Sequence, residues 1–341
     1  MKCTIQNIAD HLGLSRNTVS KALKNSSEVS ENTRNLVIKT ASKLGYKNAT
    51  FATPVIPASE TGSNGTILFL TRTYASDSEF WTTVLRGIES ILSNANYHLA
   101  ISIMSDSDLK QLNFPQTISD SSIKGIILVE ICDKVVCDAL SQFNLPIVSV
   151  DMPNVPFEEL NGIDVVTMES KKNLKKIINQ LIEKGAESFG FVGDLYSPNV
   201  SRGFQERYNA LSECLAEHQL PLNQKNCLLH QTPDDFRNFQ TTVNNLQAMI
   251  SLPDVFICGN DWTAIQLIYA LQFLGFQIPK DICVVGFDNI PAASRISPSL
   301  TTISTPQKYL GIAAARQILE RIQHPNSVSY THLTLPTICS V

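Results

Sequence analysis

The sequence predicts an α/β protein in which a small all-α unit precedes two lobes of parallel β-sheet flanked by helices. Residues 4–46 carry apolar side chains at the three- and four-residue spacing of short helices. From residue 66 onward, apolar runs of strand length alternate with longer helical patterns, and this alternation occurs twice. A chain of 341 residues that is 43% hydrophobic and 17% charged can bury the cores that such an architecture needs.

The N-terminal stretch predicts three helices in order. Thr4 can cap the first helix, and Gly13 supplies the tight turn that follows it. Ser15 can cap the second helix, while Ser30 opens the third and Gly45 ends it. The apolar side chains that we expect to face inward are Ile5, Ile8, Ala9, Leu12, Val19, Ala22, Leu23, Val37, Ala41 and Leu44.

The second predicted helix leaves a polar, basic face opposite its apolar side. A helix, a tight turn and a second helix with hydrogen-bonding side chains near its N-terminus form the helix-turn-helix plan, whose second helix enters the DNA major groove. Arg16 and Lys21 can donate to guanine N7 and O6, and Asn17 can bond an adenine edge or a phosphate. Thr18 and Asn25 suit phosphate contacts. The predicted DNA-binding residues of this unit are Thr4, Ser15, Arg16, Asn17, Thr18, Ser20, Lys21 and Asn25.

The charge distribution favours DNA binding over the alternative, a helical bundle with a solvated basic face. Residues 1–50 hold eight Lys or Arg and three Asp or Glu, a balance of +5, whereas the whole chain is at −4. A compact basic unit on an acidic body can bind phosphates locally while the body repels them. We therefore expect DNA binding with an affinity that falls steeply as salt rises.

Composition and motifs also limit the other function classes. No run of about 18 apolar residues would span a bilayer, and the first residues lack a signal peptide's apolar core, so we expect a cytoplasmic protein without a membrane partner. The eight cysteines show no C-x-x-C or paired Cys/His spacing, which favours reduced core thiols over a metal site. The sequence lacks G-x-x-x-x-G-K-[ST], H-E-x-x-H and G-x-S-x-G motifs, so we expect neither an enzyme nor a cofactor.

Several short stretches occur in one order along the chain. In the N-terminal unit they are Thr4-Ile5, Ile8-Ala9, Gly13, Ser15, Thr18-Val19-Ser20, Leu23, Val29-Ser30-Glu31, Thr33-Arg34 and Leu44-Gly45-Tyr46. Beyond it they are Phe80-Trp81, Gly87-Ile88-Glu89, KGIIL at 124–128, NDWTA at 260–264, PKDICVVGFDN at 279–289 and PSLTT at 298–302. Together they cover essentially residues 4–323, and they resemble the LacI/GalR family of bacterial transcriptional regulators.

The resemblance implies a sequence-specific repressor that acts as a homodimer, with two headpieces on a pseudo-palindromic operator. It also implies a two-lobed periplasmic-binding-protein-like domain that holds a small-molecule effector, a sugar or sugar derivative, and thereby alters operator affinity. We expect a headpiece at 1–47, a linker or hinge at 48–65, rich in Pro, Ser, Thr and Gly, and an effector-binding and dimerisation domain at 66–326. Within that domain, we expect lobe one at 66–161 plus 291–323 and lobe two at 162–290.

The family's effector-binding arginine resembles Arg207, which lies in the run FQERY at 204–208. The resemblance places Asn260 and Asp288 beside it, and it adds Asp151 after the strand PIVSV and Phe80 as an apolar wall. A guanidinium, an amide and a carboxylate at strand ends can bond vicinal hydroxyls in a fixed orientation. The structural alternatives are a surface ion pair for Arg207, a turn position for Asp288 and core packing for Phe80.

A sugar-binding receptor of the periplasmic type, without DNA function, is the alternative function because it shares the two-lobed fold. Such a receptor would need a signal peptide in place of the headpiece, and residues 1–30 show none. We therefore favour the regulator.

Two departures from the family pattern affect what the resemblance implies. In relatives, a hinge helix follows the third helix, and its leucine wedges into the minor groove. Here Pro54 could start such a helix, but Pro57 lacks the N–H that should make the first helical hydrogen bond. We expect Val55 or Ile56 to act as the wedge and DNA bending to be weaker. The strand DVVTM is expected to open the second lobe, and Glu169-Ser170 follows it where relatives have Asp-Asn, so the polar pattern of the cleft differs.

The C-terminal residues 327–341 predict a non-native tail. Residues 328–337, VSYTHLTLPT, match the translation of a transposon-end sequencing adapter, in a place where relatives have a loop and a last strand. We expect the natural protein to depart from this chain near Asn326. The alternative is a genuine edge strand, because Leu333 and Leu335 alternate with polar neighbours.

Overall fold

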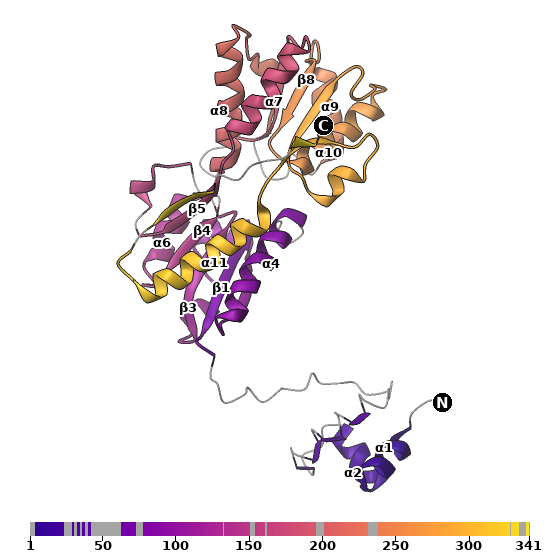
Figure 1. Cartoon of the computed structure of the whole chain (residues 1–341), viewed down its shortest axis with the longest axis vertical. Coiled ribbons are helices and arrows are strands. Elements are labelled where there is room, and N and C mark those ends of the chain that lie inside the picture. Colours follow the sequence, from indigo (N-terminus) through magenta and orange to yellow (C-terminus); the bar gives the residue numbers. More distant parts are fainter. Residues whose placement is uncertain are drawn as a thin grey trace. The chain divides into compact units, whose positions relative to one another are not determined.

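The computed structural model divides the chain into two compact units, Met1–Gly62 and Ser63–Val341 (Figure 1). The boundary between them falls within the linker that the sequence predicts. The structure describes residues 4–23, 29–30, 33–34, 36–37, 40–41, 63–72, 78–131, 133–150, 154–160, 162–195, 201–230, 238–327, 329–333 and 339–340.

The first unit contains the helices α1 (Ile5–Leu12) and α2 (Arg16–Leu23), as the sequence predicts. The helical residues at 33–34, 36–37 and 40–41 fall within the predicted third helix, while Leu44 and Gly45 lie outside the described residues. The buried side chains form one cluster of Ile8, Ala9, Val19, Ala22, Val29, Val37 and Ala41. The spacing of apolar residues along each helix therefore determines how this unit packs.

Side-chain hydrogen bonds mark the start of both helices, and a glycine marks the end of α1. The Thr4 hydroxyl accepts the Asn7 N–H at 3.3 Å, and Gly13 ends α1 in the left-handed region at φ 64°. The Ser15 hydroxyl accepts the Thr18 N–H at 3.0 Å at the start of α2. All three predicted roles, the two caps and the glycine turn, are confirmed.

The second unit begins with lobe one, a parallel sheet of order β11-β5-β4-β3-β1-β2. Its strands are β1 (Thr66–Arg72), β2 (His98–Met104), β3 (Ile123–Val129), β4 (Ile147–Val150), β5 (Asp164–Met168) and β11 (Tyr330–Leu333). The short 3-10 helices η2 (Gln116–Ser119) and η3 (Phe157–Glu159) lie in its connections.

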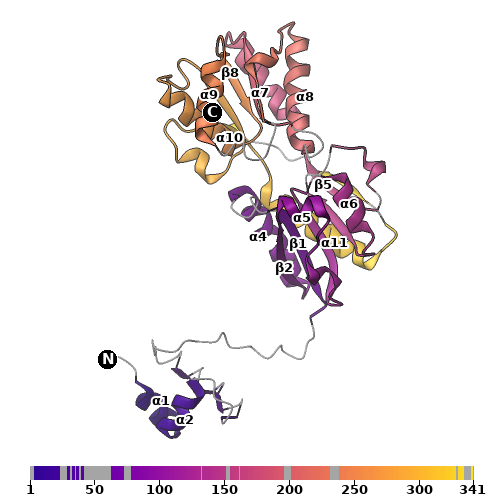
Figure 2. The same cartoon turned by 180° about the vertical axis from the view of Figure 1, so that it is seen from behind.

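Helices cover both faces of the first sheet (Figures 1 and 2). Alternate residues of β1 enter different clusters: Ile67 and Phe69 lie on one face, and Leu68 and Leu70 lie on the other, as the two-residue period of a strand requires. The first face packs against α4 (Glu79–Asn94) and α11 (Gln307–Gln323), and the second against α5 (Asp106–Gln111) and α6 (Lys134–Ser141).

Lobe two repeats the plan with a sheet of order β12-β10-β9-β8-β6-β7, which is parallel except for β12. Its strands are β6 (Phe189–Asp194), β7 (Leu228–His230), β8 (Val255–Cys258), β9 (Cys283–Asp288), β10 (Thr301–Ser304) and β12 (Cys339–Ser340). Its helices are α7 (Lys172–Glu183), α8 (Arg202–Glu217), η4 (Gln224–Asn226), α9 (Phe239–Ala248), α10 (Asp261–Phe273) and η6 (Pro291–Ser294). The predicted α/β class with two parallel sheets is confirmed.

The strand pairing corrects two of the predicted lobe boundaries. The strand DVVTM was expected to open lobe two, but as β5 it pairs with β4 in the first sheet, with Val148 opposite Asp164. Residues 291–306 were expected in lobe one, but β10 pairs with β9 in the second sheet, with Thr302 opposite Gly286. A long-range contact explains why β5 joins the first sheet. The carboxylate of Asp164, the first residue of β5, accepts a hydrogen bond from Arg321 of α11 at 2.9 Å.

The structure lays the C-terminal residues against both sheets. β11 pairs in parallel with β5, and the Tyr330 ring stacks on Phe157 with their centroids 4.7 Å apart. Residues 330–333 alternate between exposed and half-buried positions, which is the edge-strand pattern of the alternative interpretation. The adapter interpretation concerns the nucleotide sequence, so it stays a prediction.

Candidate functional site

The candidate DNA-binding face lies on α2. Arg16 and Asn17 are exposed in its first turn, while Val19 and Ala22 are buried on the opposite side of the helix. The predicted residues Ser15, Thr18, Ser20 and Lys21 are exposed or half-buried, and Thr4 is exposed at the start of α1; Asn25 and Val55 lie outside the described residues. The helix thus exposes a guanidinium and an amide in its first turn, and both groups can bond base edges and phosphates.

Arg207 lies inside lobe two rather than on a helix surface. Its side chain is 2% exposed, and its Nη1 donates to the Gly259 carbonyl at 2.5 Å. Its guanidinium carbon lies 3.8 Å from the centroid of the Phe287 ring. Arginine favours such stacked, hydrogen-bonded positions because its planar cation is weakly hydrated. The surface ion pair that was the alternative for this residue is therefore not formed.

Two other predicted effector residues lie at neighbouring strand ends. Asn260 follows β8, and its side-chain oxygen caps α10 by accepting the Thr263 N–H at 2.9 Å. Asp288 ends β9 at φ 123°, 7% exposed, and its carbonyl accepts from Gln307 Nε2 at 2.6 Å. Because Arg207 contacts Gly259 and Phe287, the residues just before these two, the fold brings the three predicted positions together.

The remaining two predictions have different outcomes. Asp151 lies outside the described residues. Phe80 is 7% exposed in the core of lobe one and packs edge-on against Trp81, with the ring centroids 4.7 Å apart. That placement matches the packing alternative, and a role as a ligand wall stays a prediction.

Sequence reasoning missed charged residues that end the strands of lobe one. Arg72 ends β1 and forms an ion pair with Asp106, while Glu130 follows β3 and accepts a hydrogen bond from the Trp81 indole. The carboxyl ends of parallel strands form one edge, where ligands bind in open sheets. The signal was available, because each residue directly follows an apolar run, TILFLT or GIILV.

Asp261, also missed, is a buried carboxylate beside this edge of lobe two. It is 0% exposed, accepts the Ile290 N–H at 2.8 Å and accepts a second hydrogen bond from the Thr302 hydroxyl. Burial raises the pKa of Asp261, and these hydrogen bonds and the charge of Arg207 oppose the rise. The carboxylate thus ties the start of α10 to β10 and supports the strand ends around Asn260.

Several polar atoms near the strand ends are buried without a hydrogen bond among the described residues. They are the hydroxyl oxygens of Thr71, Ser149 and Ser170, Oε2 of Glu169 and Nε of Arg207. Such groups are rare inside proteins, and a ligand or water that bonds them is one of the standard explanations. Thr71 and Ser149 are the second-last residues of β1 and β4, Glu169 and Ser170 follow β5, and Arg207 meets the end of β8 at Gly259, so each group lies near the carboxyl end of a strand.

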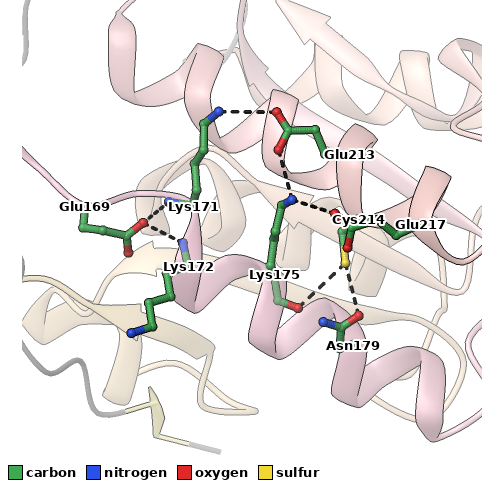
Figure 3. A network of polar contacts seen from close by, with 8 residues as sticks. All are labelled: Glu169, Lys171, Lys172, Lys175, Asn179, Glu213, Cys214 and Glu217. Atoms are coloured by element: carbon green, nitrogen blue, oxygen red, sulfur yellow. Dashed lines mark hydrogen bonds and ion pairs between the residues drawn. The ribbon is translucent and has the colours of Figure 1, made fainter.

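Glu169, one of the departures from the family pattern, is partly engaged in structure. Its Oε1 accepts the backbone N–H groups of Lys171 and Lys172 at 2.7 and 2.6 Å (Figure 3). A carboxylate at a helix N-terminus satisfies otherwise unbonded N–H groups and complements the helix dipole. Glu169 therefore anchors α7 where the chain passes from lobe one to lobe two.

Metal-ligating side chains do not form a cluster among the described residues. No group of three or more His, Cys, Asp or Glu side chains suitable for a metal ion occurs among the described residues. Cys137, Cys214 and Cys258 are buried free thiols, and burial raises the pKa of Cys137 to about 12. Among the described residues, no helix is both long and apolar enough to cross a bilayer.

Comparison with known proteins identifies the two parts of the chain. Residues 4–48 match the family described as bacterial regulatory proteins, lacI family, and residues 178–340 match the periplasmic binding protein-like domain. The chain is thus of the class that joins a DNA-binding headpiece to a periplasmic-binding-protein-like domain. Its N-terminal unit is a domain of the LacI family of bacterial regulatory proteins, as the sequence resemblance predicts.

Individual relatives extend over nearly the whole chain. The ribose operon repressor of Haemophilus influenzae is 27% identical, over 98% of this chain and 96% of the relative. A LacI family regulator from Enterococcus faecium with bound ribose is 25% identical, with a TM-score of 0.64 over 81% of this chain and 97% of its own. The lac repressor dimer bound to operator is 19% identical, with a TM-score of 0.66 over 99% and 98%, and shares the fold. The chain is therefore a DNA-binding transcriptional regulator with an effector domain, and the receptor alternative gains no support.

Proposed function

We propose that the chain is a repressor that binds a pseudo-palindromic operator as a homodimer and changes its operator affinity when a sugar binds between its lobes. The observation that carries the effector half is the set of buried, unbonded polar atoms of Thr71, Ser149, Ser170, Glu169 and Arg207. Sugar hydroxyls both donate and accept, so one ligand can satisfy donors and acceptors together. Ribose is named for several relatives, which makes D-ribose the first probe.

The proposed operator binding rests on the exposed first turn of α2. Arg16 and Asn17 would contact base edges there, and the caps at Thr4 and Ser15 would hold the helix ends against phosphates. Val55 or Ile56 remains the proposed minor-groove wedge. This activity would take place in the cytoplasm, where the operator is accessible.

The DNA-binding test selects duplexes from a random library with the full chain. Raising the salt from about 50 to about 200 mM should weaken binding by about a thousandfold, because Lys and Arg release counterions from phosphates. Arg16→Ala should lower affinity by about 1–3 kcal/mol at one base position. Gln6→Ala, exposed on α1, is the control and should bind like the parent chain. Salt-insensitive or absent binding would leave the receptor alternative instead.

The effector test uses calorimetry with D-ribose and, separately, cellobiose, which is named for another solved relative. Ser149→Ala removes a buried hydroxyl that bonds no described residue, so the free energy of unfolding should stay equal or rise. Sugar affinity should nevertheless fall roughly tenfold, because the lost hydroxyl would bond the ligand. Unchanged affinity in this variant would contradict a ligand contact at Ser149.

A further inference from the structure

Arg202 occupies a position that helix stability does not explain. It is the first residue of α8 in lobe two, and the preceding Ser201 makes no side-chain cap to the helix. A cation at a helix N-terminus faces the positive end of the helix dipole, which is unfavourable. The side chain therefore needs another reason to lie there.

The side chain extends from lobe two to lobe one. Its Nη2 donates to the Val155 carbonyl, and its guanidinium carbon lies 4.2 Å from the centroid of the Phe157 ring. Val155 and Phe157 pack against the buried cluster of lobe one to which α6 contributes, so they belong to that lobe. The contact combines a charge-assisted hydrogen bond with a cation–π contact, and both depend on direction and distance.

The contact lies away from the segments that connect the lobes. The chain passes from β5 to α7 at Glu169–Lys171, from β10 to α11 at Thr305–Pro306, and again between β11 and β12. Arg202 instead meets the connection between β4 and β5. A second inter-lobe hydrogen bond, from the Ala292 N–H to Glu79 Oε2 at 3.1 Å, lies at the start of α4. In Figure 1, α8 and β5 lie on one side of the second unit and α4 and α10 on the other. The two contacts therefore flank the region between the lobes.

A contact between parts that are not hinges forms at one lobe angle and breaks at another. Any such contact shifts the balance between lobe arrangements by its own free energy. α8 also carries Arg207, whose guanidinium is held by Gly259 and Phe287 at the strand ends. A movement of α8 thus changes both the inter-lobe contact and the environment of the candidate effector site.

We infer that Arg202 is a positioning residue that holds the two lobes together through Val155 and Phe157, and so sets how readily the effector domain changes its lobe angle. The inference rests on the proposed function for its regulatory meaning, but the contact itself can be tested without effector or DNA. Tyr330 stacks on Phe157 as well, yet neither Arg202 contact involves it. The Tyr330 hydroxyl also donates to the Phe157 carbonyl at 2.8 Å, so residues 327–341 help to position the ring that Arg202 meets.

The test is hydrogen exchange of the full, ligand-free chain, compared between the parent and Arg202→Gln. Exchange of the backbone amides at 154–160 and in the first turn of α8 should rise roughly tenfold, because both sides of the contact open more often. Arg202→Lys keeps the charge but not the planar fork, and should restore part of the protection. The control is Arg316→Gln, whose arginine is exposed on α11 and takes part in neither inter-lobe contact, and it should exchange like the parent.

The locality of the effect separates positioning from general stability. A merely structural Arg202 would change exchange along α8 and leave residues 154–160 of lobe one unaffected, which would overturn the inference. Should Arg202→Gln fail to fold, Phe157→Leu removes the ring face while keeping an apolar side chain, and it should raise exchange at the first turn of α8. D-ribose is then added to each variant as a separate arm. Absence of sugar binding would argue against the proposed function and leave the exchange result standing.

Discussion

Ion pairs in the two lobes have nearly the same geometry and very different surroundings. In lobe one, Arg321 of α11 lies 2.9 Å from Asp164, and the two side chains are 10% and 0% exposed. In lobe two, Lys175 of α7 lies 3.0 Å from Glu213 of α8, and these side chains are 27% and 47% exposed (Figure 3). A buried pair whose partner is removed leaves an uncompensated charge, whereas a solvated pair exchanges its partner for water. Burial rather than distance therefore determines which pair the fold depends on.

The helix contacts around these pairs differ in the same way. α11 meets α4 through Gly311 and Gly87, and a Cβ at either position would collide with the backbone of the facing helix, at Val84 and Lys308 respectively. α7 meets α8 partly through the surface network that Lys171, Lys175, Glu213 and Glu217 form. Lobe one thus has a close, directional helix contact, while the polar part of the lobe two contact is adjustable.

The largest effect is expected for Arg321→Met. Removing the guanidinium leaves the Asp164 carboxylate buried without its ion-pair partner, which should lower the free energy of unfolding by about 3–5 kcal/mol. The Ser327 and Gly162 carbonyls also lose their hydrogen bonds. Urea unfolding measures the change. The double variant with Asp164→Leu should recover much of it, and a single-variant loss below about 1 kcal/mol would remove the contrast between the lobes.

A smaller effect is expected for Gly311→Ala. Alanine is the better helix former by about 1 kcal/mol, so propensity alone predicts a gain in stability. The collision of the new Cβ with the Val84 carbonyl should instead produce a loss of about 1–3 kcal/mol. Thermal unfolding distinguishes the two signs. Arg316→Ala, exposed on the same helix, is the control and should change stability by less than about 0.5 kcal/mol.

The smallest effect is expected for Lys175→Met. Exposed pairs contribute about 0–1 kcal/mol, and roughly 1 M salt should abolish the difference from the parent. Hydrogen bonds from Lys175 and Lys171 lower the pKa of Glu213 below its ordinary value of 4.5. The contribution is therefore present above pH 4.5 and is lost as the pH falls through the lowered pKa. Lys176→Met, exposed on the same helix, is the control. If Lys175→Met still lowers the free energy of unfolding in high salt, the aliphatic part of the Lys175 side chain contributes by packing as well.

The headpiece could be predicted in detail because its determinants are local. Thr4, Gly13 and Ser15 act on residues at most four positions away, and the apolar spacing that defines each helix also defines the core. The two-lobed α/β class was equally accessible, because the alternation of strand and helix patterns survives in the sequence. The family resemblance then pointed to the strand-end positions Arg207, Asn260 and Asp288.

The sequence by itself thus determined the type of each element and the order of the two parts. Only the tertiary structure decided which sheet β5 and β10 join, that Arg207 lies buried over Phe287, and that Arg202 reaches Phe157. The reason is physical: an apolar strand buried on both faces can pair with any similar strand, and long side chains meet partners 45 or more residues away. Such choices are made by packing and by the burial of charges such as Asp164, and neither leaves a periodic signal in the chain.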